Sequence, residues 1–185
     1  MGKGEIGDFV FGLKLCKFVQ TKTTLMKIRF DEKGRLHPYE VIEMSIENFE
    51  SIFVERQENV GHRRIIFEKY LDFNKELEDV VGRNYFQFVN GSFTTLKTTP
   101  GDIDVVSFVD YYMYKKHQDA LEDLFYRKVS VKYLDAYILP ISKPGYPDYI
   151  ENQISLEWWK SLFGFTKSKV ESKREPKGFI KIDFK

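Results

Sequence analysis

The sequence predicts one α/β (α+β) domain built on one small mixed sheet with flanking helices. Three observations lead to this prediction: a long segment with apolar residues at helical spacing, a series of short β-rich runs after it, and turn residues between them. The 185 residues suit a single domain, and 42% hydrophobic residues supply enough apolar material for one core. The alternation of helix and strand signals favours helices packed against a sheet.

The long helical segment runs from Asn59 to Val81, and Gly82 is its expected C-cap. Earlier in the chain, the polar stretch 31–35 is typical of a turn, with Gly34 available for a positive φ. Ser45, followed three residues later by Asn48, indicates the start of a short helix.

The rest of the chain alternates between strand and helix signals. In order, we expect a strand at Tyr85–Val89, a strand at Ile103–Val109, a helix at Lys116–Lys128, a strand at Val129–Leu139, a helix at Ile154–Phe163 and a strand at Phe179–Phe184. Pro140 is expected to end the third strand. The residues expected to face inward on the first of these helices are Ala120, Leu121, Leu124 and Phe125.

Composition limits the classes of function. The net charge of +1 provides no global field for nucleic acid, and the single cysteine, Cys16, cannot form an internal disulfide. The three histidines are scattered without the spacing of a zinc site. No apolar run approaches the roughly 18 to 20 residues that cross a bilayer, so we expect a cytoplasmic protein with no membrane partner. Residues 1–25 fit either an extra strand or a loosely docked helix.

Three aspartates are the candidate catalytic and metal-binding residues. Asp102 and Asp104 flank Ile103 at the start of the second strand, so the two carboxylates point the same way. Asp135 lies in the third strand between Leu134 and Ala136, where a carboxylate is costly unless it is paired or bound to metal. Adjacent carboxylates favour a hard cation, and three of them could hold two Mg²⁺ ions.

A Gly-Ser turn precedes the aspartates and is the candidate phosphate site. Gly91 lets the backbone approach a ligand closely, and the Ser92 hydroxyl with neighbouring N–H groups could cradle phosphates. Lys97 could add a positive charge to the same phosphates, although a surface lysine is the commoner role. Each feature is ordinary by itself; their combination in this order points to nucleotide chemistry.

The segment from Asn90-Gly91-Ser92 to Asp102-Ile103-Asp104, with the later strand residue Asp135, resembles the signature of the DNA polymerase β-type nucleotidyltransferase superfamily. More narrowly, the chain resembles a family of small bacterial nucleotidyltransferase-like proteins. The further shared segments are residues 30–36 (FDEKGRL), 158–164 (WWKSLFG) and 176–180 (PKGFI). The resemblance covers roughly Met26 to Ile182. It defines a nucleotidyltransferase-like domain at 26–185 and an extension at 1–25, which we expect to be peripheral to the site.

This resemblance implies a Mg²⁺-dependent enzyme that transfers a nucleoside monophosphate from a nucleoside triphosphate such as ATP to a hydroxyl of a protein, an RNA or a small molecule. Relatives in the superfamily include antitoxins that adenylylate a partner protein and usually carry basic residues soon after the Gly-Ser. This chain has Phe93, Thr94 and Thr95 there. The alternative is a non-catalytic binding module of the same fold, such as an antitoxin or a component of a bacterial defence or toxin–antitoxin pair.

Two further features could contribute to binding. Trp158 and Trp159 could stack on a base, although an aromatic pair in a helix more often packs against a core. The stretch 167–177 has an excess of positive charge and could contact RNA or a triphosphate, although such a stretch more often forms a solvated loop.

Overall fold

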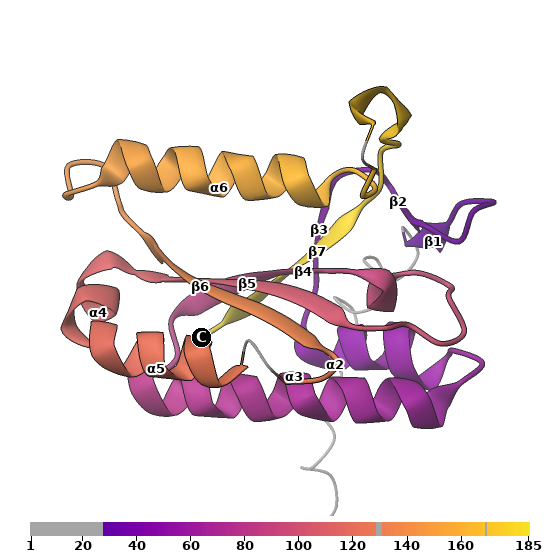
Figure 1. Ribbon diagram of the computed structural model, residues 1–185, viewed down its shortest axis with the longest axis horizontal. Helices are drawn as coiled ribbons and strands as arrows, with labels where there is room; N and C mark the ends of the chain where they lie inside the picture. Colours follow the sequence, from indigo (N-terminus) through magenta and orange to yellow (C-terminus); the bar gives the residue numbers. More distant parts are fainter. Residues whose placement is uncertain (1–27, 129–130, 169) are drawn as a thin grey trace, which may run out of the picture.

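The protein is a mixed five-stranded sheet with helices on both faces, as the computed structural model shows for residues 28–128, 131–168 and 170–185 (Figure 1). The α/β class with one mixed sheet is therefore confirmed. The expectations for residues 1–25 lie outside the described residues. No helix among those described is both long and apolar enough to cross a membrane.

The elements, in chain order, are β1 (Arg29–Phe30), β2 (Leu36–His37), β3 (Val41–Glu43), α2 (Ile46–Glu50), a π-helical segment (Ser51–Glu55), α3 (Val60–Val81), β4 (Tyr85–Asn90), a 3-10 helix (Ser92–Thr94), β5 (Ile103–Asp110), α4 (Tyr111–Lys116), α5 (Gln118–Lys128), β6 (Leu134–Ile141), α6 (Tyr149–Phe163), a second 3-10 helix (Glu171–Lys173) and β7 (Phe179–Phe184).

The strand order in the main sheet is β3-β7-β4-β5-β6. Strand β4 pairs antiparallel with β5 and β7, whereas the outer pairs β3–β7 and β5–β6 are parallel. The alternating run predicted at the C-terminus is therefore an inner strand, β7. Strands β1 and β2 form a separate hairpin, and the turn predicted between them is confirmed, with Gly34 at φ 71°.

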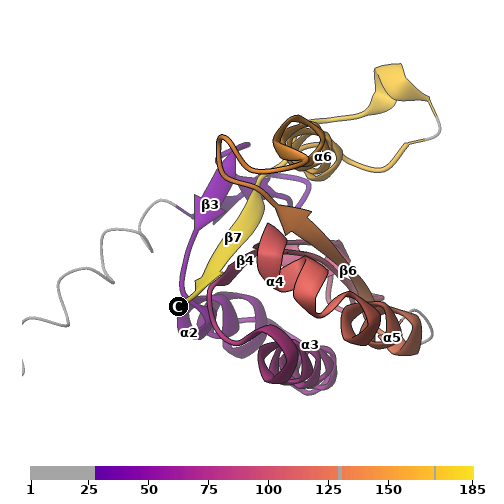
Figure 2. The same cartoon turned by 90° about the vertical axis from the view of Figure 1, so that its left-hand side faces the viewer.

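Helices cover the two faces of the sheet unequally. Helix α6 lies alone on one face, and α2, α3, α4 and α5 lie on the other (Figures 1 and 2). Alternation along β5 divides its side chains between these layers: Ile103 and Val105 belong to the larger core, and Val106 and Phe108 pack with residues of α6 in the smaller one. This division decides which way Asp104 points.

The predictions for the helices around Ser45 and at Asn59–Val81 are confirmed. The Ser45 side chain accepts a hydrogen bond from the Asn48 N–H and caps α2. Helix α3 has Asn59 at its N-cap and Gly82 at its C-cap, and it buries one apolar face against the sheet.

Several sequence expectations were wrong. Helix α6 begins at Tyr149 and not near Ile154. Strand β6 does not end at Pro140 but continues through it to Ile141, because β6 is an edge strand, where a missing N–H is tolerated. Residues 131–133 precede the strand and do not belong to it. Ala120 is exposed on α5, although Leu121 and Leu124 are buried as expected and Phe125 is half-buried.

Candidate active site

The strand register brings two of the three predicted aspartates together. Asp104 on β5 lies opposite Asn90 on β4 and Asp135 on β6. Residues in register on neighbouring strands share a face, and Val106 shows that this face is the one covered by α6. Asp102 is half-buried and immediately precedes β5. Asp104 and Asp135 thus lie side by side where β4 ends and β5 and β6 begin.

Asp104 is the buried member of this group, with only 5% of its surface exposed. Its Oδ2 lies 3.4 Å from the Nζ of Lys167. Among the described residues, no group hydrogen-bonds to its buried Oδ1. Burial raises the pKa of Asp104, and the charges of Asp102 and Asp135 raise it further, while Lys167 opposes them. Buried polar atoms without a partner are rare in folded proteins, and this oxygen is free to accept from a ligand or a water.

Asp135 is exposed, so the cost expected for a carboxylate between two apolar residues of a strand does not arise. Its neighbours Leu134 and Ala136 are buried on the opposite face of β6, and Asp135 points away from them. Because β6 is an edge strand, the carboxylate reaches solvent while remaining beside Asp104. An exposed carboxylate next to a buried one can contact a ligand that arrives from solution.

The Gly-Ser turn lies directly against Asp104. Gly91 has φ 92° and caps the 3-10 helix Ser92–Thr94, outside the β4 ladder. Within the part of the chain that the structure describes, no carbonyl accepts from the N–H groups of Gly91 or Ser92. The Ser92 Oγ accepts a hydrogen bond from the Gly101 N–H at 2.9 Å and so connects this turn to the segment that leads into Asp102.

Gly91 should tolerate no side chain. An ideal Cβ there would lie 3.0 Å from the backbone nitrogen and 3.2 Å from the Oδ2 of Asp104. Gly82 provides a matched control, because its φ of 70° and ψ of –174° resemble the φ of 92° and ψ of –171° at Gly91, yet nothing lies within 4 Å of its Cβ. Both Gly→Ala variants should incur the backbone strain of about 1 to 3 kcal/mol.

Gly91→Ala should therefore be less stable than Gly82→Ala in urea denaturation, and only Gly91→Ala should disturb ligand binding beside Asp104. Equal losses of stability, with binding retained in both variants, would mean that the close approach to Asp104 is unimportant.

A C-terminal arm (residues 164–178) completes the site from the side of α6. Its two ends are joined by a hydrogen bond from the Lys177 N–H to the Gly164 carbonyl at 2.9 Å. Glu175 ties the arm to the β1–β2 hairpin through an ion pair with Arg35 at 2.7 Å. Lys167 and Lys177 on this arm line the same pocket as Asp104 and Asp135.

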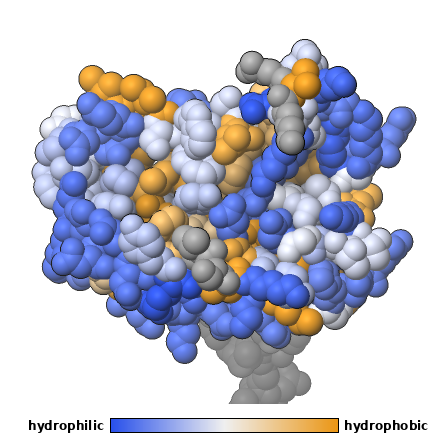
Figure 3. Space-filling model, in the orientation of Figure 1, coloured by the Kyte–Doolittle hydropathy of each residue, from blue (hydrophilic) through white to orange (hydrophobic). Residues whose placement is uncertain are grey.

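Together these elements enclose a pocket of about 300 Å³ between α6, the strand ends and the arm. One end is polar, and its lining residues are Asn90, Asp104, Asp135, Lys167 and Lys177. Hydrophobic residues gather between α6 and the layer of helices beyond the sheet, surrounded by hydrophilic ones (Figure 3). Lys97 is exposed and does not line this pocket. Lys167 and Lys177, from a stretch that composition alone would assign to a solvated loop, contribute the positive charges instead.

Lys177 has an unusual ionisation. Burial lowers its pKa from 10.5 to about 8, with Asp104 opposing and Lys167 adding to the shift. Between these two pH values the unfolded chain binds a proton that the folded chain has lost, so this group makes stability rise with pH.

The free energy of unfolding of the wild type is compared with that of Lys177→Met between about pH 8 and pH 10.5. Taking the difference removes the pH dependence that comes from the other titratable groups. We expect the wild type to gain stability relative to the variant as pH rises from about 8 to 10.5. A difference that does not change with pH would show that Lys177 titrates normally.

Arg63 supports the site from the opposite face of the sheet. This buried side chain of α3 donates through Nη1 to the carbonyls of Phe53 at 2.9 Å and Phe93 at 2.7 Å. Its Nη2 donates to the carbonyls of Thr95 and Lys97, both at 2.7 Å. One guanidinium therefore fixes the loop that follows Gly91 and Ser92. Nothing in the sequence distinguishes Arg63 from an exposed helix arginine.

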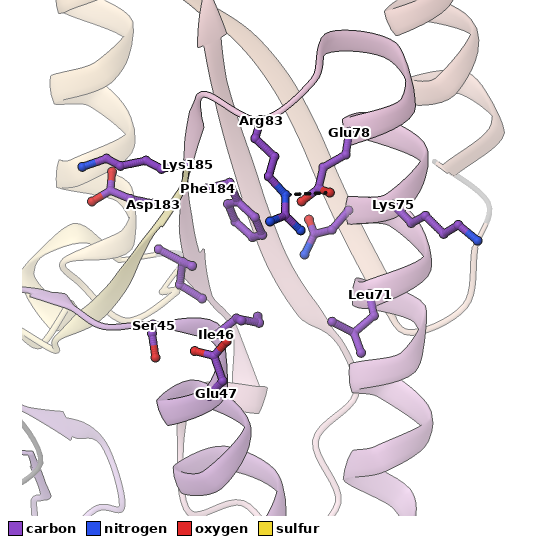
Figure 4. Close-up of a pocket in the computed structure, with 12 residues that line it drawn as sticks. Ser45, Ile46, Glu47, Leu71, Lys75, Glu78, Arg83, Asp183, Phe184 and Lys185 are labelled. Atoms are coloured by element: carbon purple, nitrogen blue, oxygen red, sulfur yellow. Dashed lines mark hydrogen bonds and ion pairs between the residues drawn. The ribbon is translucent and has the colours of Figure 1, made fainter. Parts of the chain in front are cut away.

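A second pocket, of about 360 Å³, lies at the opposite end of β4 from the aspartates, between α3 and the end of β7 (Figure 4). Its charged residues carry both signs, and the Nε of Arg83 pairs with the Oε2 of Glu78 at 3.2 Å. This mixture of charges does not define a ligand of one chemical class.

The residues at the carboxylate pocket fit a metal–phosphate ligand better than an isolated metal. Within 28–128, 131–168 and 170–185, no three His, Cys, Asp or Glu side chains lie close enough to hold one ion. Mg²⁺, however, is usually bound by one or two carboxylates together with waters and substrate phosphates. The unpartnered Oδ1 of Asp104 and the exposed carboxylate of Asp135 are a donor set of that kind.

The chain belongs to a family of unknown function, DUF6932, whose model matches residues 28–183. The matched region contains all three aspartates, the Gly-Ser turn and the C-terminal arm. No curated protein and no solved structure matches the chain.

Proposed function

We propose that this protein is a Mg²⁺-dependent nucleotidyltransferase with a polymerase β-type fold. It transfers a nucleoside monophosphate from a nucleoside triphosphate to a hydroxyl of a protein, an RNA or a small molecule. The observation that carries the proposal is the buried Asp104 with an unpartnered carboxylate oxygen, in register with Asp135 and in contact range of the Gly91 turn.

The topology supports the fold assignment. A Gly-Ser turn follows one strand, an Asp-x-Asp pair opens its antiparallel neighbour, and a third aspartate lies near the start of the next, parallel strand. The order of these features agrees with the superfamily signature, and the strand register supports the assignment independently of motif spacing.

Each residue has a chemical role in the proposed reaction. The acceptor oxygen forms a bond to the α-phosphorus, the bond to the bridging oxygen breaks, and pyrophosphate leaves with that electron pair. Bound Mg²⁺ would supply charge neutralisation at the phosphates. The free N–H groups of Gly91 and Ser92 can donate to phosphate oxygens, and Lys167 and Lys177 add positive charge. Asp135, exposed beside the site, can accept the proton of the acceptor hydroxyl.

The contact between Lys167 and Asp104 must open for this chemistry. The ammonium lies beside Oδ2, where it balances the carboxylate charge that a metal ion would otherwise balance. Because the Lys167 side chain is 81% exposed, it can leave Asp104 and be solvated at little cost. Divalent metal and lysine therefore compete for Asp104.

The same contact favours the alternative function, a non-catalytic binding module of a toxin–antitoxin or defence pair. If Lys167 remained on Asp104, the pocket could hold a nucleotide without assembling a metal site.

Labelling separates the two functions. The full chain is incubated with Mg²⁺, a cell lysate and nucleoside triphosphates labelled at the α-phosphate. We expect label on an acceptor with the wild type and none with Asp104→Asn. Saturable nucleotide binding without any labelled acceptor would support the binding module and contradict the transferase.

A further inference from the structure

The pocket has a second, aromatic end that the catalytic proposal does not use. Its side chains come from β6, α6 and the C-terminal arm: Tyr137, Trp158, Trp159, Leu162, Phe163 and Phe165. The ring centroids of Tyr137 and Trp159 are 5.0 Å apart, and those of Trp158 and Trp159 are 4.9 Å apart in an edge-to-face arrangement.

Two of these aromatic residues are exposed instead of packed. Trp159 is 9% exposed and belongs to the small core, whereas Trp158 is 56% exposed and Phe165 42%. Trp158 therefore presents a large apolar surface to a pocket that also contains charged groups. Large exposed aromatic surface beside a polar site is typical of a binding surface.

The two ends of the pocket are separated by a distance that suits a nucleotide. Tyr137 lies two residues after Asp135 on β6 and shares its face, so the Cα atoms of these two residues are about 7 Å apart along the strand. In a nucleotide, a ribose separates the planar base from the α-phosphate. The volume of about 300 Å³ is at the lower end for small-molecule sites and fits one nucleotide better than a strand.

We propose that the aromatic end binds the nucleobase of the donor nucleotide, with Trp158 as the exposed stacking surface and Phe165 beside it. This inference rests on the proposed function and names the part of the substrate that α6 and the arm recognise. Stacking accepts any base, so it provides affinity for nucleosides without strong selection among them. The polar end binds the phosphates, and the lysines of the arm face them.

The sequence offers a direct probe, because its only two tryptophans, Trp158 and Trp159, both line this pocket. Tryptophan emission is excited at the red edge of its absorption, where adenine does not absorb, and the full chain is titrated with adenosine, ATP or inorganic tripolyphosphate. Adenosine should quench the emission even without Mg²⁺, and ATP should quench it at lower concentration. Tripolyphosphate, which has no base, should leave it nearly unchanged.

Variants identify the stacking residue. Removing one base-stacking aromatic side chain corresponds to a loss of about tenfold to a hundredfold in affinity. Trp158→Ala should therefore weaken adenosine binding by that factor, as measured by calorimetry, while binding of tripolyphosphate is unaffected. Trp158→Phe should restore most of the affinity. Because Trp158 is largely exposed, neither change should alter the core.

The outcomes distinguish this inference from the catalytic proposal. If ATP is transferred to an acceptor but neither adenosine nor ATP changes tryptophan emission, the base does not bind here and the inference is overturned. The inference is also overturned if Trp158→Ala binds adenosine as tightly as the wild type. If adenosine binding depends on Trp158 and no acceptor is labelled, the nucleobase site is supported and the proposed nucleotidyltransferase activity is contradicted.

Discussion

Replacing Asp104 with Asn should abolish nucleotidyl transfer while leaving the folded protein as stable as before, or slightly more stable. A metal ion contributes several kcal/mol to charge stabilisation in a transition state, so losing its ligand corresponds to about a thousandfold or more in rate. Stability should not fall, because the carboxylate is 5% exposed and its Oδ1 is without a partner among the described residues. Lys167, released from the pair, remains solvated.

The labelling assay measures the loss of transfer, and thermal melts measure stability and the shift caused by ligand. The wild type should melt at higher temperature with Mg²⁺ and ATP, since a ligand that binds only the native state stabilises it. Asp104→Asn should show little of this shift. Asp79→Asn is the control, because Asp79 is an exposed carboxylate on α3, and it should behave as the wild type does. The account would be contradicted if Asp104→Asn were less stable than the wild type and the wild type showed no shift with Mg²⁺ and ATP. Asp104 would then contribute to stability and not to ligand binding.

Replacing Arg63 with Met should cause the largest loss of stability. The side chain is 1% exposed and is the donor to four backbone carbonyls, which Met would leave without that partner. Hydrogen bonds from charged donors contribute about 1.5 to 3 kcal/mol each and are not additive, so we expect a loss of at least about 3 kcal/mol. The loop after Ser92 should loosen, and nucleotide binding should weaken with it.

Arg64→Met provides the matched comparison. Arg64 is the next residue on α3, pairs with Glu50 and is 35% exposed. Partly exposed ion pairs contribute about 0 to 1 kcal/mol, so its replacement should have a small effect. Urea denaturation of both variants measures the difference, and similar losses would show that the four carbonyl contacts of Arg63 contribute little. Arg63→Lys should also be less stable than the wild type, because the lysine ammonium lacks the planar set of N–H donors with which a guanidinium reaches several carbonyls.

The sequence predicted the parts of the fold that depend on local pattern. Helix α3, the cap at Ser45 and strands β4, β5 and β7 follow from spacing and turn residues. It did not predict α4, which begins at Tyr111 with tyrosines that favour strands. It also ended β6 too early, because nothing local indicates that Pro140 lies on an edge strand.

The candidate site was predictable where it depends on strand alternation, and not where it depends on long-range packing. Alternation along β5 sets the face of Asp104, and the register then adds Asp135. Phe165, Lys167 and Lys177 reach the pocket only because the C-terminal arm folds back beside α6. Arg63 was not predicted, because a buried arginine without an acidic partner is rare and leaves no signature in sequence.

The most direct measurement of the central claim is a crystal structure of the protein with Mn²⁺ and a non-hydrolysable ATP analogue, with the metal located by anomalous scattering. The account predicts an Mn²⁺ ion bound to Oδ1 of Asp104 and to the phosphates, with the triphosphate against the N–H groups of Gly91 and Ser92 and Lys167 moved away from Oδ2. A bound nucleotide with no metal at Asp104, and with the Lys167 ammonium still beside Oδ2, would contradict it.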